Sequence, residues 1–181
     1  MIKEIWNFLW KSNSIWSWIV DLILAFLIVR FMIFPLLSFM LSTPLPLVVV
    51  ESGSMEHKMN FDSWWLEKGQ WYIDHNISKE QFEKWNLKNG FNKGDIIIAK
   101  GSHHYEKGDI IIFKSLQPTP IIHRIISQND DLSFQTKGDH NSIQLPYEKK
   151  VKMSSILGKA WIRIPYIGWI KLFFVELIKS L

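Results

Sequence analysis

The sequence feature that most limits the fold is a long apolar stretch near the N-terminus, residues 15–41. A transmembrane helix needs about 20 consecutive, mainly apolar residues, and this stretch is long enough to supply them. Asp21 and Arg30 interrupt it, but both lie away from its middle, where a charge can snorkel or pair within the protein. Pro35 is expected to kink or end the helix. The stretch therefore predicts a membrane anchor.

We interpret the stretch as an anchor that stays on the mature chain. A cleavable signal peptide fits poorly, because the stretch is too long and no small-x-small cleavage site follows it. The flank before the stretch carries Lys3 and Lys11 against Glu4, a slight excess of positive charge. Such an excess favours a cytoplasmic location for the N-terminus. We expect a single-pass protein of the plasma membrane. Residues 1–43 would be its cytoplasmic N-terminus and anchor, and the remainder would lie outside the cytoplasm.

Beyond the anchor, the pattern changes to short β-branched runs bounded by Gly, Asp, Pro or Asn. Such runs predict an all-β barrel or sandwich, which we place over residues 44–165. The runs are residues 47–50, 96–98, 110–113, 121–126 and 132–136, with one or two further strands in 151–164.

The string Lys-Gly-Asp-Ile-Ile-Ile occurs twice, at residues 93–98 and 107–112. Lys-Gly-Asp is favourable turn chemistry before a strand. Because two copies are too few for a repeat array, we interpret them as two turns with similar local requirements.

Residues 58–92 interrupt the β pattern with an aromatic-rich insertion. Its tryptophans and tyrosine are Trp64, Trp65, Trp71, Tyr72 and Trp85. Ser78-Lys79-Glu80-Gln81 resembles a capping box that opens a short helix. We favour a helical insertion packed by its own aromatic rings, and we keep open a membrane-surface or substrate-gating element.

Composition and the C-terminal segment also point towards a membrane surface. The chain has 10 tryptophans among 181 residues, and indole rings concentrate at membrane interfaces. Residues 166–181 are apolar but shorter than a usual span, so they form either an interfacial helix, which we favour, or a second membrane helix. A net charge of +4 without a dense basic run argues against nucleic acid as a partner. The absence of cysteine excludes disulfides, thiolate zinc sites and a cysteine nucleophile.

Three polar residues are candidates for chemistry, and each signal is weak by itself. Ser54 lies in a Ser-Gly-Ser turn after a strand, where open backbone can present N–H groups to an oxyanion. A serine nucleophile needs a base, and His123 lies within a strand pattern. Asp139, in the turn after another strand, is a candidate for holding that base in its tautomer. The simpler explanations are an ordinary loop, a core histidine and a turn aspartate. No ligand spacing among the histidines supports a zinc site.

Taken together, these residues resemble the sequence boxes of type I signal peptidases. In chain order, residues 52–56 resemble the nucleophile box, 107–114 the Gly-Asp strand, 122–125 the base box and 136–141 the Gly-Asp-Asn box. The order is that of the family, and the resemblance covers most of residues 15–170. The base box holds His123, so the chain resembles the histidine branch of archaea and the eukaryotic endoplasmic reticulum, which a minority of Gram-positive enzymes share. The bacterial branch has lysine there.

The resemblance implies a membrane-bound serine endopeptidase of the signal peptidase I type, with a β-barrel or sandwich catalytic domain. It would remove signal peptides from secreted preproteins after small side chains, at the lipid bilayer and near the secretion channel. Ser54 would be the nucleophile and His123 the general base, with Asp139 orienting or supporting His123. The Ser54 amide and the Ser52 hydroxyl would form the oxyanion hole. The resemblance implies no metal and no cofactor.

The sequence departs from the family pattern at two places. The family usually has proline after Met-Glu, where this chain has His57. The histidine branch usually carries a second aspartate shortly after the Gly-Asp box, but residues 142–146 hold no carboxylate. Either Asp139 alone is the acid partner, or an unaligned group such as Asp130 or Asp131 serves. The missing carboxylate also keeps open a catalytically impaired signal-peptidase-like subunit that binds signal peptides, whereas a soluble self-cleaving regulator with a lysine base fits neither His123 nor the anchor.

Overall fold

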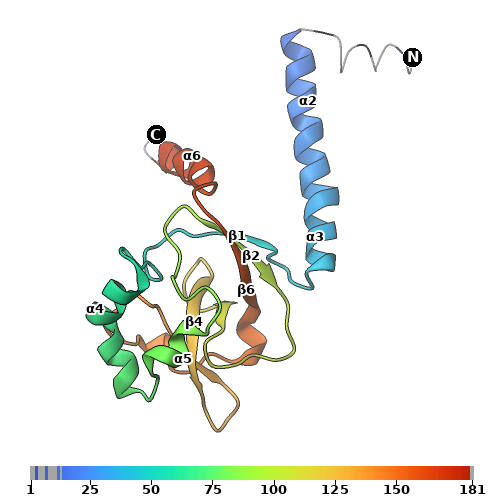
Figure 1. Ribbon diagram of the computed structural model, residues 1–181. Helices are drawn as coiled ribbons and strands as arrows, with labels where there is room; N and C mark the ends of the chain where they lie inside the picture. Colours follow the sequence, from blue (N-terminus) through green and yellow to red (C-terminus); the bar gives the residue numbers. More distant parts are fainter. Residues whose placement is uncertain (1–2, 4–6, 8–11, 13, 180–181) are drawn as a thin grey trace. The chain divides into compact units, whose positions relative to one another are not determined.

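The computed structural model describes Lys3, Asn7, Ser12 and residues 14–179 (Figure 1). The chain forms two compact units, residues 1–40 and residues 41–181. The positive flank predicted from Lys11 and Glu4 lies outside the described residues, as do the last two residues of the C-terminal segment.

The first unit contains one continuous helix, made of α2 (Ile15–Ile28), η1 (Val29–Ile33) and α3 (Phe34–Met40). It is 26 residues long and apolar enough to cross a membrane. The Ser14 side chain accepts the first free amide, that of Trp16. Pro35 does not end the helix. The π-helical turn of η1 lies directly before it, and such a turn accommodates the missing amide hydrogen of proline and its bulky ring.

The second unit is built on a six-stranded antiparallel sheet in the order β1-β2-β6-β3-β4-β5, which confirms the predicted mainly β fold with an N-terminal apolar helix (Figure 1). The strands are β1 (Leu47–Val49), β2 (Ile96–Lys100), β3 (Ile110–Phe113), β4 (Ile121–Gln128), β5 (Phe134–Lys137) and β6 (Ile156–Ile164). Each of the five predicted runs overlaps one strand, and β2, β4 and β5 extend beyond the predicted bounds. The segment 151–164 holds β6, preceded by an isolated bridge between Val151 and Phe134.

The strand β6 is the last in sequence, yet it lies inside the sheet between β2 and β3. It pairs antiparallel with both neighbours. As a result, β6 joins the pair β1–β2 to the meander β3–β4–β5. Of the pair, β1 precedes the Ser-Gly-Ser turn in the sequence and β2 follows it. The candidate base, His123, lies on β4 of that meander, and the turn with Gly138 and Asp139 follows β5.

The strand β4 presents different chemistry on its two faces. His123 lies opposite Ile111 of β3, and Arg124 lies opposite Lys137 of β5. Successive side chains of a strand point to opposite faces, so His123 and Arg124 serve different sides of the sheet. Residues 123–126 are all buried, which means that both faces of β4 are covered here.

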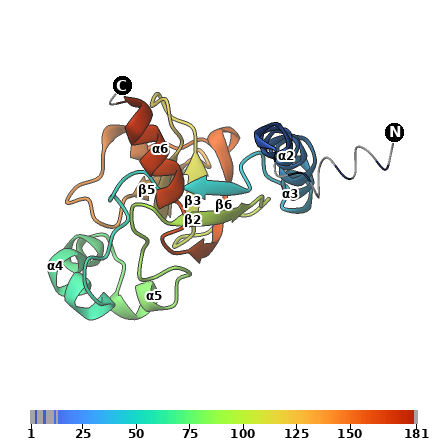
Figure 2. The same cartoon turned by 90° about the horizontal axis from the view of Figure 1, so that it is seen from above.

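Two short helices, α4 (Phe61–Asp74) and α5 (Lys79–Glu83), form the insertion over residues 58–92, called here the aromatic lobe. Figures 1 and 2 show the two helices together, apart from α6. The buried cluster of the lobe is Phe61, Trp64, Trp65, Tyr72, Ile77, Phe82 and Ile126, with Trp71 and Trp85 packed against it. The rings thus pack on one another and, through Ile126, on β4.

The predicted capping box at the start of α5 is confirmed. The Ser78 hydroxyl accepts the amide of Gln81 at 3.3 Å, and the Gln81 side-chain oxygen accepts the amide of Ser78 at 3.1 Å. Two amides that lack partners inside the helix are satisfied in this way. The short helix therefore has a defined start that places Phe82 in the lobe cluster.

The helix α6 (Trp169–Lys179) closes the described chain. It buries Leu172, while most of its other apolar side chains are exposed. Lys171 contacts Glu51, directly after β1, at 3.0 Å. This exposed apolar helix is compatible with the interfacial segment expected over residues 166–181, which stays a prediction.

The two Lys-Gly-Asp strings form similar turns before β2 and β3, as predicted. Gly94 and Gly108 have φ angles of 88° and 99°, a region that side chains with a Cβ rarely adopt. In each turn the following aspartate, Asp95 or Asp109, accepts the amide three residues earlier, at 2.7 Å and 3.0 Å. The shared string therefore reflects shared turn geometry.

Replacing Gly108 with alanine is expected to destabilise the second unit by roughly 1–3 kcal/mol. The positive φ is strained for alanine, and the new Cβ would lie 2.4 Å from the Trp85 ring. The measurement is thermal unfolding of the purified chain in detergent, with the exposed neighbour Lys107→Ala as control. Equal unfolding temperatures for the two variants would contradict the expectation.

Candidate active site

The nucleophile candidate lies in a turn that is fixed by backbone hydrogen bonds on two sides. The Ser54 carbonyl accepts the amide of His140 at 2.8 Å, and the Met55 carbonyl accepts the amide of Phe91 at 3.1 Å. The first bond comes from the turn after β5 and the second from the end of the aromatic lobe. The position of Ser54 therefore depends on both segments.

The structure brings Ser54 and His123 together. The His123 Nε2 lies 3.0 Å from the Ser54 Oγ, within hydrogen-bond distance. His123 is buried and Ser54 is partly exposed. The Ser52 hydroxyl lies 3.3 Å from the Ser54 hydroxyl. A buried imidazole in this position can take a proton from a serine hydroxyl that a peptide can reach.

The carboxylate behind His123 belongs to Glu148, which the sequence did not single out. Its Oε1 lies 2.5 Å from the His123 Nδ1, at ion-pair distance but outside the geometry of an aligned hydrogen bond. The same oxygen accepts the Gly138 amide at 3.0 Å, and Oε2 accepts the Leu145 amide at 2.5 Å. Two backbone amides therefore hold a fully buried carboxylate beside the second imidazole nitrogen.

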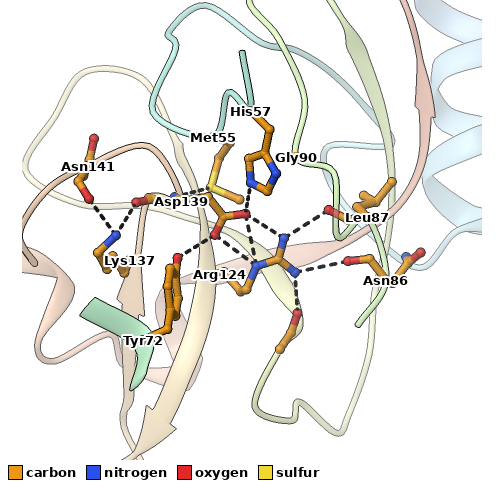
Figure 3. A network of polar contacts seen from close by, with 12 residues as sticks. Met55, His57, Tyr72, Asn86, Leu87, Gly90, Arg124, Lys137, Asp139 and Asn141 are labelled. Carbon is orange, nitrogen blue, oxygen red and sulfur yellow. Dashed lines mark hydrogen bonds and ion pairs between the residues drawn. The ribbon is translucent and has the colours of Figure 1, made fainter. Parts of the chain in front are cut away.

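The carboxylate of Asp139 makes its contacts with Arg124, Tyr72 and His57. Its Oδ2 lies 2.7 Å from the Nη2 of Arg124, and its Oδ1 accepts hydrogen bonds from the Arg124 Nε and the Tyr72 hydroxyl, both at 3.0 Å (Figure 3). His57 lies 3.2 Å away. Among residues 14–179, no hydrogen bond or ion pair joins Asp139 to His123. Arg124, on the opposite face of β4, pairs with this carboxylate, and the role expected for Asp139 in orienting or supporting His123 stays a prediction.

Arg124 is fully buried and uses its remaining donors on backbone carbonyls. It donates to the carbonyls of Asn86 and Leu87, both at 3.1 Å, and of Gly108 at 3.0 Å (Figure 3). Its guanidinium lies 4.7 Å from the centre of the Phe82 ring. Burial alone would raise the pKa of Asp139, but the adjacent Arg124 charge and the hydrogen bonds from His57 and Arg124 outweigh it. These interactions hold the pKa well below its usual range.

His57, which stands where the family usually has proline, is turned towards Asp139 and the lobe. Its ring stacks on Trp64 with 3.7 Å between ring centres and a 7° interplanar angle. Burial lowers the pKa of His57, and the hydrogen bond to Asp139 opposes that effect. The substitution thus connects the nucleophile turn to the aromatic lobe.

Glu148 was missed because its position depends on a turn that local patterns did not reveal. The short helix η2 (Pro146–Glu148) brings the carboxylate back towards β4. Glu148 also lies just beyond residues 142–146, the region that matches the family's second aspartate. Asp131, one of the two unaligned candidates, pairs instead with Lys150 at 2.6 Å and with Ser133. The useful signal would have been proline at the first position of a short helix that ends in a carboxylate.

A groove of about 540 Å³ adjoins these residues. Its lining includes Ser54, His123, residues 47–50 of β1 and its continuation, and residues 119–122 at the start of β4. Most of these lining residues are apolar. Within the described part of the chain, no group of three His, Cys, Asp or Glu side chains is arranged to hold a metal ion. The arrangement therefore places a serine hydroxyl and an imidazole beside a mainly apolar groove.

Comparison with known proteins gives the chemical context. No family model matches the chain. The signal peptidase complex catalytic subunit SEC11 of Candida albicans is 26% identical over 157 residues, covering 81% of this chain and 75% of that protein. The corresponding subunit of Lodderomyces elongisporus has the same identity and coverage. Human SEC11C is 26% identical over 96 residues, covering 46% of this chain and 50% of that protein. The chain is thus similar, at 26% identity, to signal peptidase catalytic subunits of fungi and mammals.

Replacing Asp139 with asparagine is expected to cost about 3–5 kcal/mol of folding stability, because the buried Arg124 charge would lose its counter-ion. Asp62→Asn provides a matched control, since Asp62 pairs with Lys79 on the exposed surface. That control should change stability little, because water screens exposed pairs. The measurement is unfolding of the detergent-purified variants, and similar losses in both would contradict the prediction.

Proposed function

We propose that the chain is a membrane-bound serine endopeptidase that removes signal peptides from secreted preproteins after small side chains. The observation that carries the proposal is the 3.0 Å contact between the Ser54 hydroxyl and the His123 imidazole. The similarity to signal peptidase catalytic subunits supplies the substrate class. The groove beside Ser54 supplies a site where a peptide can reach the hydroxyl.

In the proposed reaction, the Ser54 oxygen attacks the scissile carbonyl while the His123 Nε2 takes its proton. The tetrahedral intermediate collapses, the peptide C–N bond breaks, and His123 returns the proton to the leaving amine. Water, activated by His123, then hydrolyses the ester and regenerates the serine. We assign oxyanion stabilisation to the Ser54 amide and the Ser52 hydroxyl, which lies 3.3 Å from the Ser54 hydroxyl.

We assign Glu148 as the acid partner of His123. Its position at Nδ1 favours the tautomer that leaves Nε2 free to accept the serine proton, and its charge stabilises the imidazolium that forms. Asp139 then has a supporting role. It anchors the turn beside Ser54 through Arg124 and does not contact the base itself.

The substrate is expected to bind as an added strand. β1 comes first in the sheet order and pairs with β2 on one side, so among the described residues its other edge, next to the groove, pairs with no strand. An extended peptide on that edge would place alternate side chains into the groove and its carbonyl near Ser54. A shallow, mainly apolar lining is compatible with the small residues that precede a signal-peptide cleavage site.

The proposed location is the plasma membrane, with the helix over residues 15–40 as anchor and the second unit outside the cytoplasm near the secretion channel. The helix is long and apolar enough to span a bilayer. The alternative, an impaired subunit that binds signal peptides without cutting them, rested on the missing second carboxylate. Glu148 beside His123 supports the catalytic proposal over this alternative.

The proposal predicts that the chain, purified in detergent, cleaves a preprotein at its signal-peptide junction. Ser54→Ala and His123→Ala should each lower kcat by roughly 10⁴-fold or more, because nucleophile and base act as one unit. Cleavage is followed by the mass of the released mature protein. An inert wild type would favour the non-catalytic subunit, and a Ser54→Ala variant that cuts normally would refute the assignment.

Glu148→Gln is expected to lower kcat by roughly 10²–10⁴-fold, because an amide cannot stabilise the imidazolium and permits the wrong tautomer. Asp131→Asn removes the carboxylate that pairs with Lys150, so this variant should keep the wild-type kcat. The comparison uses the same preprotein assay at saturating substrate. Normal turnover by Glu148→Gln would contradict the assignment of Glu148 as the acid partner of His123.

A further inference from the structure

Lys137, at the end of β5, is a fully buried lysine to which the proposed reaction gives no role. Its ammonium donates to the carbonyl of Asn141 at 2.7 Å and to that of Gly138 at 3.1 Å (Figure 3). These two carbonyls belong to the two ends of one turn, residues 138–141. The ammonium therefore bridges the turn from inside and contacts backbone oxygens rather than the Ser54 hydroxyl.

The bridged turn contacts both partners of His123. The His140 amide donates to the Ser54 carbonyl at 2.8 Å, and the Gly138 amide donates to Glu148 at 3.0 Å. The space is tight: a Cβ on Gly138 would lie 2.8 Å from both the His123 Nε2 and the Ser54 carbonyl oxygen. A small movement of this turn would therefore change the distance between nucleophile and base.

The aromatic lobe provides the surface on which this ammonium rests. The Lys137 Nζ lies 4.8 Å from the centre of the Trp71 ring and 4.9 Å from that of Tyr72, both on α4. Such cation–π contacts are stronger where water is excluded, as it is here. The same helix also reaches the turn through the hydrogen bond from the Tyr72 hydroxyl to Asp139. The lobe and the turn are thus joined by a charged group and a hydrogen bond.

We propose that Lys137 is a positioning residue for catalysis: resting on Trp71 and Tyr72, it holds the 138–141 turn in the geometry that keeps Ser54 within reach of His123. The aromatic lobe is then part of the catalytic apparatus, because it supplies the surface that keeps the ammonium in place. This inference rests on the proposed peptidase function and adds to it a role for the insertion.

The surroundings of Lys137 give this role a pH signature. Burial lowers the pKa of Lys137 to about 8, and the carboxylates of Asp139 and Glu148 oppose that effect, while Lys68 on α4 adds to it. The pKa of Tyr72 is raised well above its usual value, so its hydroxyl stays neutral in this range. Above pH 8, therefore, the lysine loses its charge, its cation–π contacts and one of its donors. Catalysis should weaken there.

The test compares Lys137→Met with Lys100→Met in the preprotein assay. Methionine keeps the apolar stem of Lys137 but removes the ammonium, so kcat should fall about 10- to 100-fold while KM changes little. The wild-type decline in kcat above about pH 8 should disappear in this variant. Lys100 also lies over a tryptophan, Trp161 at 5.3 Å, but on the exposed part of β2. Its variant should keep the wild-type kcat, KM and pH profile.

Trp71→Leu serves as a second variant that leaves the lysine in place but removes one ring beneath it. It should lower kcat less than Lys137→Met does, with KM again unchanged, and it decides the question if the lysine variant does not fold. Wild-type kcat with a normal alkaline decline in either folded variant would overturn the inference. A rise in KM alone would overturn it too, because that would make Lys137 a substrate-binding residue. An inert wild type would instead refute the proposed function.

Discussion

The buried ion pair between Arg124 and Asp139 is the interaction on which the rest of the site depends. Removing two charges from water is costly, and a buried pair does not by itself guarantee a more stable protein. Here every participant is also bonded to a different segment: Arg124 binds carbonyls at residues 86, 87 and 108, and Asp139 accepts from Tyr72 and His57. The pair therefore fixes three segments relative to one another: the aromatic lobe, the turn that holds Ser54, and the turn at residues 138–141.

This arrangement separates support from chemistry across a single strand. Arg124 and His123 are neighbours on β4, and the alternation of side chains turns the first towards the ion pair and the second towards Ser54. Two buried carboxylates contact these two side chains separately. Asp139 neutralises the arginine, and Glu148 lies behind the imidazole. A single carboxylate could not do both, because the guanidinium of Arg124 and the imidazole of His123 lie on opposite faces of the sheet.

Local patterns were sufficient for most of the fold and for part of the site. The β-branched runs, the two Gly-Asp turns and the capping box at Ser78 each depend on a few neighbouring residues, so they could be predicted from the sequence. Ser54 and His123 could be paired through the order of the sequence boxes. Glu148, the proposed acid partner, could not be found in this way, because its place depends on how η2 folds back towards β4. The contacts between the aromatic lobe and Lys137 are likewise tertiary, and no spacing in the sequence reveals them.

The central place of β6 has a consequence for when the site can exist. Ser54 follows β1, His123 lies on β4, and these strands belong to the two parts of the sheet that β6 joins. Pairings between distant segments form late, since the intervening chain must first be ordered. During synthesis, the sheet stays in two separate pieces until residues 156–164 have emerged. A nascent chain therefore carries Ser54 long before it has a complete sheet, and the proposed nucleophile and base belong to one continuous sheet only once β6 has paired.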